Sequence, residues 1–468
     1  MKKKISLLEA SIVLIIILLS ISVGVIALKI SPNVVVLFAI AITMGYMAIK
    51  RMPLERINEG IVRGLKPGII PIFIFLLVGA LIAVWIQAGI IPTLMVVGFK
   101  LLSVKWFVPS VFIVCAVVGS AVGSAFTVMS TVGIAFFGIG ATLGLNPALV
   151  VGAIASGSIF GDKMSPLSES TNLASAVVGA DLFDHIKNMM WSTIPAFVVS
   201  LILFAVLGTN TQATQLGDVQ EVINVLEANF NISVWALVPI VLMLVCAWKK
   251  VPAIVTILLN VVVAVVMIII QQGGFNPVEM ASVIENGFVS HTGHEQVDLL
   301  LTRGGINSMT FTVLLIILTL SLGGLLMKAG LVSTVIDAVA RKLTSSAQLI
   351  IVSLFSSIGI NIFVGEQLLS VILPGDAFKN EFKRVGLAPV VLSRTLEDGG
   401  TVINYLIPWG IAGSFVAGTF GVPTIEYLPF VFFSLLSPVF SIVSAVTGIG
   451  VKHVEPEIMV RETSVSHN

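Results

Sequence analysis

Two polar segments interrupt the long apolar runs of this sequence, and their residue types could bind a cation. The first, SGSIFGDKMSPLSESTNLAS, spans residues 156–175 and combines carboxylates with hydroxyl and amide side chains. These oxygens are hard ligands, which suit Na⁺ for the same reason that they suit other hard cations. The candidate ligands in this segment are Asp162, Ser168, Glu169, Thr171 and Asn172.

The second polar segment, SRTLEDGGTVINYLIPWG at residues 393–410, repeats this chemistry. Its candidate ligands are Glu397, Asp398, Thr401 and Asn404. Each segment also has a basic residue, Lys163 or Arg394, which could be a counter-charge or could hold a substrate carboxylate. A charge inside a membrane span costs at least about 2.5–3.5 kcal/mol, so several of them indicate function. Structural ion pairs that stabilise broken helices remain the alternative for Lys163, Arg394 and Glu397.

The composition places these segments in a membrane protein. Of the 468 residues, 57% are apolar and only 10% are charged, against about 25% charged residues in soluble domains. The predicted fold class is therefore an all-α multi-pass membrane protein. A net charge of +1 gives no general attraction to nucleic acid. The two cysteines, Cys115 and Cys246, lie in apolar runs, which excludes a disulfide scaffold and a zinc site. We expect no resident cofactor.

Many apolar runs are long enough to cross a hydrocarbon layer of roughly 30 Å. The uninterrupted ones are residues 8–28, 33–49, 68–87, 189–207, 232–247, 252–270, 309–327 and 426–449. Lysine and arginine cluster in alternate loops, beginning with Lys2–Lys4. Because such clusters stay on the cytoplasmic side, both termini are predicted to be cytoplasmic.

Short repeated strings indicate that the chain consists of two similar halves. AGIIPT at 88–93 and AGLVST at 329–334 are separated by 241 positions, and LSESTN at 167–172 resembles LEDGGT at 396–401 at an offset of 229. The charge pattern places residue 90 outside and residue 331 inside. The halves would then have opposite orientations, which is the inverted-repeat plan of many secondary transporters.

Each half is predicted to contain a hairpin, a broken helix and a closing helix. Unwound backbone at membrane depth is tolerated only where it lines a cavity or is buried in protein. Glu366, near the second hairpin's tip, and Asp376, near its cytoplasmic end, are candidate gate residues or structural contacts. The predicted boundaries are 1–208 for the first repeat (hairpin 108–141, broken helix 147–178, closing helix 189–207), 209–231 for an external linker, 232–450 for the second repeat (hairpin 347–378, broken helix 387–420, closing helix 426–449) and 451–468 for a cytoplasmic tail.

The strings FGDKMSPLSESTNLA and LSRTLEDGGTVINYLIPW resemble the NhaC family of Na⁺/H⁺ antiporters, and GSAFTVMSTVGIAFFGIG at 123–140 extends the resemblance. It implies an inverted-repeat fold of the ion-transporter type in a bacterial cell membrane, with Na⁺ and H⁺ as the transported ions. Two departures concern the site: Glu169 replaces the family's usual Asp, and a Gly–Gly pair ending at Gly400 replaces its common Ser–Gly. The resemblance assigns cation or proton handling to Asp162, Ser168, Glu169, Thr171, Asn172, Glu397, Asp398 and Thr401.

A carboxylate at membrane depth that binds either H⁺ or Na⁺, and is exposed to each side in turn, would suffice for exchange. The chain also looks similar to the family's malate/lactate branch, which predicts malate uptake with protons and lactate efflux with Na⁺. Simple Na⁺/H⁺ antiport, a cation-coupled organic-acid symporter and a channel are the transport alternatives. An intramembrane enzyme is disfavoured, because H-E-x-x-H is absent and all five histidines fall in predicted loops or the tail, including a solvated pair at His291 and His294. A homodimer is compatible with the sequence.

Overall fold

The computed structural model describes residues 5–101, 106–209, 216–249, 251–340, 343 and 345–454. Within these ranges the chain is helical, and its only extended pairings are two isolated bridges, Phe288 with Arg303 and Leu387 with His453. Eight of the described helices are long and apolar enough to cross a membrane, or ten if each bent pair counts as one span. This confirms the predicted all-α multi-pass class.

Among its described residues, the first half contains eleven α-helices in chain order. They are α1 (Leu7–Ser22), α2 (Pro32–Ile49), α3 (Leu54–Leu65), α4 (Ile69–Gln87), α5 (Ile90–Leu101), α6 (Phe107–Val122), α7 (Ala125–Val128), α8 (Ile134–Thr142), α9 (Pro147–Met164), α10 (Glu169–Val178) and α11 (Leu182–Thr209). Two five-residue π-helical stretches follow α1 and join α7 to α8.

The remainder contains α12 (Leu216–Asn229), α13 (Val238–Trp248), α14 (Ala253–Gln272), α15 (Pro277–Asn286), α16 (Glu295–Leu301), α17 (Thr310–Lys328), α18 (Leu331–Ala340), α19 (Ser346–Val364), α20 (Gln367–Arg384), α21 (Pro389–Leu396), α22 (Ile411–Phe420), α23 (Thr424–Tyr427) and α24 (Phe432–Thr447). A π-helical stretch, Glu397–Thr401, continues α21.

The two halves share one sequence of elements at a nearly constant spacing. Helices α4 and α17 both begin and end 241 positions apart, while α10 and α22 both begin and end 242 positions apart. The AGI and AGL strings form the same turn in both halves, because Gly89 and Gly330 each have positive φ, +75° and +80°. The offset of 229 that pairs LSESTN with LEDGGT is therefore wrong. At an offset of 242, residues 167–172 correspond to 409–414 instead.

Several predicted segments differ from the observed ones. The run 426–449 is not one helix, because Thr424–Phe430 and Phe432–Thr447 meet at an angle of 56°. Residues 209–231, predicted as a linker, contain α12, and Gln220–Asn229 of this helix meets the span that begins at Val234 at an angle of 94°. The charges at 2–4, 250 and 341–342, and the tail beyond 454, lie outside the described residues. The orientation of the termini therefore stays a prediction.

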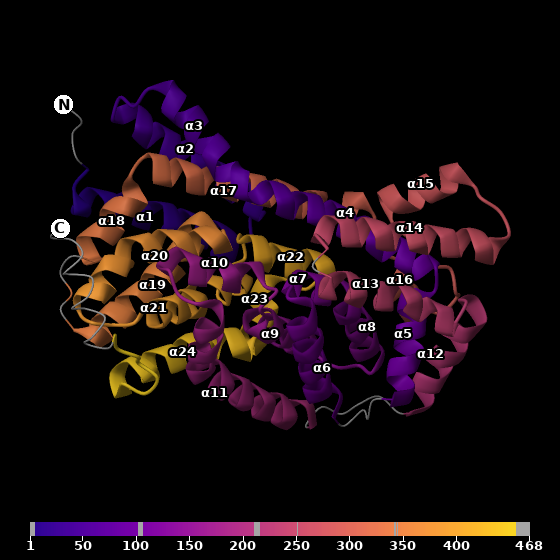
Figure 1. Ribbon diagram of the computed structural model, residues 1–468. Helices are drawn as coiled ribbons and strands as arrows, with labels where there is room; N and C mark the ends of the chain where they lie inside the picture. The colour runs from indigo at the N-terminus through magenta and orange to yellow at the C-terminus, as the bar shows by residue number, and fades with distance from the viewer. Residues whose placement is uncertain are drawn as a thin grey trace.

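Helices that are far apart in the sequence pack against one another. In Figure 1, α17 runs along the upper edge against α3 and α4, whereas α11 and α24 pack together along the lower edge. Helices α6 and α9 touch at their glycines: a Cβ on Gly161 would lie 2.5 Å from the Cα of Gly119. The GxxxG strings at 119–123 and 157–161 are therefore close-packing sites, as glycine pairs in membrane helices commonly are.

Candidate functional site

A cavity of about 750 Å³ lies where the two hairpins meet the first broken helix. The first hairpin (α6 to α8) contributes Ser124 at its tip, and the second (α19 and α20) contributes Glu366. The connection between α9 and α10 and the beginnings of α4 and α14 complete its wall. Segments more than two hundred positions apart thus form one site.

Both hairpin tips are built from a glycine followed by a side chain that caps the next helix. Gly123 and Gly365 adopt φ of +71° and +69°, a conformation that favours glycine. The Ser124 hydroxyl then accepts a hydrogen bond from the Thr127 N–H at 3.3 Å. The Glu366 carboxylate accepts from two N–H groups at the start of α20, 2.9 and 2.6 Å away, and it is only 3% exposed.

The first broken helix places Asp162 at the cavity. Helix α9 ends at Met164, and α10 begins after the capping residue Ser168. Asp162 lines the cavity, and the Ser168 hydroxyl and the Ala125 N–H of the first hairpin are polar neighbours of its carboxylate. Within the described part of the chain, no lysine or arginine pairs with Asp162. This carboxylate is therefore available to a cation or a proton.

The polar residues around the break mainly satisfy unwound backbone. The Thr171 hydroxyl donates to the Lys163 carbonyl at 3.0 Å. The Asn172 amide donates to the carbonyls of Pro166 and Ser168 at 2.8 and 2.7 Å. Such bonds replace the helical partners that the break removes. Thr171 is fully buried and does not line the cavity, whereas Asn172 does.

The second broken helix is tied to the second hairpin by two asparagines. The Asn361 amide of α19 donates to the Gly399 carbonyl at 3.1 Å and also to the Gly400 carbonyl. The Asn404 amide donates to the Asn361 side-chain oxygen at 2.9 Å, and the Asn404 oxygen accepts from the N–H of Ala412 at 2.8 Å. Asn404 lies 242 positions after Asp162 and also lines the cavity. The second half thus has a neutral amide where the first half has a carboxylate.

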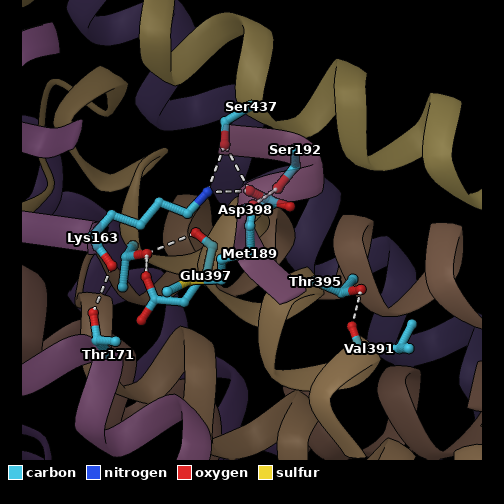
Figure 2. A network of polar contacts seen from close by, with 10 residues as sticks. Lys163, Thr171, Met189, Ser192, Val391, Thr395, Glu397, Asp398 and Ser437 are labelled. Atoms are coloured by element: carbon cyan, nitrogen blue, oxygen red, sulfur yellow. Dashed lines mark hydrogen bonds and ion pairs between the residues drawn. The ribbon is translucent and has the colours of Figure 1, made fainter. Parts of the chain in front are cut away.

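A sealed ion pair joins the two halves beside the cavity. The Lys163 amino group contacts the Asp398 carboxylate and donates to the Ser437 hydroxyl at 2.9 Å, and that hydroxyl in turn donates to Asp398 at 2.6 Å (Figure 2). The Lys163 and Asp398 side chains are 1% and 0% exposed. The Lys163 nitrogen also lies 5.6 Å from the centre of the Phe433 ring, a cation–π contact.

The other charged residues of the second polar segment are equally enclosed. The Thr401 hydroxyl contacts both the carbonyl and the carboxylate of Glu397. Arg394 donates to the Ser444 hydroxyl at 2.9 Å and to the Gly450 carbonyl at 3.2 Å. Neither Arg394 nor Lys163 lines the cavity, so in this conformation neither contacts a dissolved anion there. Lys163 is the counter-charge of Asp398, whereas Arg394 is hydrogen-bonded to a neutral hydroxyl and a carbonyl.

The structure therefore divides the sequence-predicted site in two. One group lines the cavity: Asp162, Ser168, Glu169, Asn172, Glu366 and Asn404. A second group is buried beside it: Lys163, Thr171, Arg394, Glu397, Asp398 and Thr401. Asp376 belongs to neither group, since it is exposed and pairs with Lys379 at 2.8 Å.

Sequence reasoning missed three further buried polar residues, Asn361, Ser437 and His185. Asn361 interrupts an apolar helix, and Ser437 belongs to serines at 434, 437, 441 and 444, the spacing of one helical face. Both signals were readable. The placement of every histidine in a loop or the tail was wrong: His185 lies in α11, fully buried, with its Nδ1 2.7 Å from the Ser393 hydroxyl.

Among the described residues, no three His, Cys, Asp or Glu side chains gather as a metal site. A cation at Asp162 would thus be held by a mixed set of carboxylate, hydroxyl and carbonyl oxygens. Such a set suits a weakly bound, exchangeable hard cation better than a resident transition metal.

Comparison with known proteins shows which family this chain resembles. A family model described as the Na⁺/H⁺ antiporter family matches residues 157–449. The chain is 40% identical over 424 residues to the Na⁺/H⁺ antiporter NhaC of Alkalihalophilus pseudofirmus, covering 91% of this chain and 92% of that one. It is 35% identical over 412 residues to NhaC of Bacillus subtilis, covering 88% and 90%. It is 34% identical over 394 residues to the malate-2H⁺/Na⁺-lactate antiporter of Bacillus subtilis, covering 84% of each chain.

Proposed function

The chain belongs to the NhaC family of Na⁺/H⁺ antiporters, and from this premise we propose that Na⁺ and H⁺ compete for the Asp162 carboxylate in the cavity. The observation that carries the proposal is that Asp162 faces the cavity without a basic partner among the described residues. Binding a proton and binding Na⁺ are then mutually exclusive at one carboxylate. Exchange follows if the cavity opens to each side in turn.

We infer that the buried Lys163–Asp398 pair takes part in this alternation. Lys163 directly follows Asp162 at the end of α9, whereas Asp398 belongs to the second half. A change of charge at Asp162 therefore acts next to the ion pair that joins the halves. We assign Asp398 and Lys163 to stabilising the observed closed contact between the halves, and Asp162 to binding the transported ion.

We infer that the cavity opens toward the predicted cytoplasmic side. Lys66 and the pair Val251–Pro252 lie at its edge, next to the lysine and arginine clusters that predict cytoplasmic loops. The observed conformation would then be the one that takes up Na⁺ from the cytoplasm. Asp162, Glu169 and Glu366 give its lining an excess of negative charge, which concentrates cations.

Simple Na⁺/H⁺ antiport is better supported than coupling to malate and lactate. The two NhaC relatives are 40% and 35% identical, the malate/lactate antiporter 34%. The cavity also offers an organic anion little positive charge, because Lys163 is buried in an ion pair with Asp398, and Arg394 is buried and does not line the cavity. Coupled exchange and organic-acid symport therefore become outcomes of the test.

The test uses everted membrane vesicles, which expose the cytoplasmic face, and a pH-sensitive dye. We expect Na⁺ alone to dissipate the imposed pH gradient, and Asp162→Asn to abolish this response. Glu426→Gln is the matched control, because Glu426 is exposed and does not line the cavity. A response that requires malate and lactate on opposite sides would favour coupled exchange. A normal response in Asp162→Asn would refute the assignment of the ion to this carboxylate.

A further inference from the structure

The cavity is much larger than transport of Na⁺ requires. A water molecule takes a share of about 30 Å³, so an ion with six waters fills roughly 180 Å³. The cavity has about 750 Å³, within the range of about 300–1,000 Å³ that is typical of sites for small organic molecules. Its size therefore admits a solute larger than a metal ion.

The wall of the cavity combines negative charge with aromatic and aliphatic surface. Phe75 and Phe126 line it with their rings in edge contact, 5.8 Å between centroids, close to the hairpin tips. Pro71, Ile74 and Ile257 add aliphatic surface. Aromatic faces attract organic cations through the ring quadrupole, and aliphatic walls accept their alkyl parts.

The charges of the lining select the sign of such a solute. Three carboxylates line the cavity, Asp162, Glu169 and Glu366, against one ammonium, Lys66 at its edge. Glu366 is 3% exposed and held in place by two backbone N–H groups, so its position is defined by the hairpin tip. An organic anion would be repelled, whereas a monovalent organic cation would have its charge balanced and its alkyl part covered.

We propose that this cavity also binds small organic cations of the alkylguanidinium or primary ammonium class, in competition with Na⁺. The competition rests on the proposed binding of Na⁺ at Asp162, but the binding of the organic cation does not. The charged group would lie between Glu169 and Glu366, with the alkyl chain against Phe75 and Phe126. The ligand would thus use residues on both hairpins and on the first broken helix.

Binding is tested directly on the purified full-length protein in Na⁺-free detergent solution. The probe is N-propylguanidinium, which stays protonated at all working pH values and cannot collapse a pH gradient as a weak base. N-propylurea has nearly the same shape without the charge, and butyrate has the opposite charge. A ligand that binds the folded state raises the unfolding temperature in a saturable way. We expect this for propylguanidinium at millimolar concentration, and no such rise for propylurea or butyrate.

The variants locate the site. Glu169→Gln with Glu366→Gln should raise the apparent dissociation constant of propylguanidinium at least tenfold, while Glu426→Gln should leave it unchanged. In everted vesicles with wild-type protein, propylguanidinium should raise the KM for Na⁺ without lowering the maximal rate. Equal stabilisation by propylurea, or an unchanged constant in the double variant, would overturn the inference.

The outcomes also separate this inference from the proposed function. If Na⁺ dissipates the pH gradient but propylguanidinium neither stabilises the protein nor inhibits exchange, the organic-cation site is refuted and the antiport proposal stands. If propylguanidinium binds and the double variant weakens this binding, but Na⁺ moves no protons in wild type, the organic-cation site stands and the antiport proposal is refuted.

Discussion

Lys163 and Asp398 provide the sharpest test of how the two halves are held together. The pair is 1% and 0% exposed, and its members lie 235 positions apart in the chain. Asp398→Asn would leave the Lys163 ammonium with neutral partners only: the amide at 398, the Ser437 hydroxyl and the Phe433 ring. Removing one partner of a buried ion pair costs about 3–5 kcal/mol, because the remaining charge stays desolvated.

We therefore expect Asp398→Asn and Lys163→Met each to lower the free energy of unfolding by about 3–5 kcal/mol. The double variant should lose no more than either single variant, because no uncompensated charge remains at this position. Denaturant titration in detergent micelles, followed by tryptophan fluorescence, measures all three. The interaction energy of the double-mutant cycle should be at least about 2 kcal/mol.

The exposed pair Asp376–Lys379 is the matched control, since it joins the same residue types at 2.8 Å on the surface. Lys379→Met should cost less than about 1 kcal/mol. The reasoning is refuted if the two buried substitutions cost as little as the exposed one, or if their effects simply add.

Three further predictions concern packing, the second break and the loop around α16. Gly161→Ala should destabilise the protein by about 1–3 kcal/mol, because the added Cβ would lie 2.5 Å from the Cα of Gly119. Gly359→Ala is the control, since its added Cβ meets nothing within 4 Å, and the denaturant titration compares the two variants. Asn361→Ala should cost about 1–3 kcal/mol and reduce exchange, since it leaves the buried Asn404 amide without its partner; Gln348→Ala, near the opposite end of α19, should change neither. In the loop around α16, the backbone N–H of Thr292, with further hydrogen bonds from Ser290 and Gly293, lowers the pKa of Asp298 to about 2. Because its pKa is lowered, the ionised Asp298 carboxylate stabilises the fold at pH values above about 4, the ordinary pKa of an aspartate, and this stabilisation is lost as the pH falls toward 2. Protection of amides 288–302 from hydrogen exchange should therefore decrease between about pH 4 and pH 2, and Asp298→Asn should remove this pH dependence.

Much of the local structure could be read from the sequence because its causes are local. Pro147 and Pro389 begin equivalent helices, and Ser168 caps α10 directly after the break. The glycines of the AGI and AGL strings end α4 and α17 because both adopt positive φ. Backbone preferences and capping chemistry act over a few residues, so they leave a readable pattern.

Similarity between short strings was a poor guide to which positions of the two halves are equivalent, because the strings share residue types and not their place in the fold. LSESTN and LEDGGT are both acidic and hydroxyl-rich, but the second lies one to two turns ahead of the break in its own half. Equivalent positions at the breaks are Asp162 and Asn404, which differ in charge. The structure thus shows that two pseudo-symmetric frameworks hold different chemistry, which spacing of similar residues could not reveal.

The sequence by itself determined that this chain spans a membrane, that two polar segments lie within it and that these segments contain the candidate ion ligands. Only the tertiary structure decided that Asp162 faces the cavity while its neighbour Lys163 pairs with Asp398 in a sealed interior. The reason is physical. A charge in a low-dielectric interior is stable only when it is paired, and its partner can come from any part of the chain that packs against it. Here α9 packs against the second half, which supplies Asp398 as the partner of Lys163.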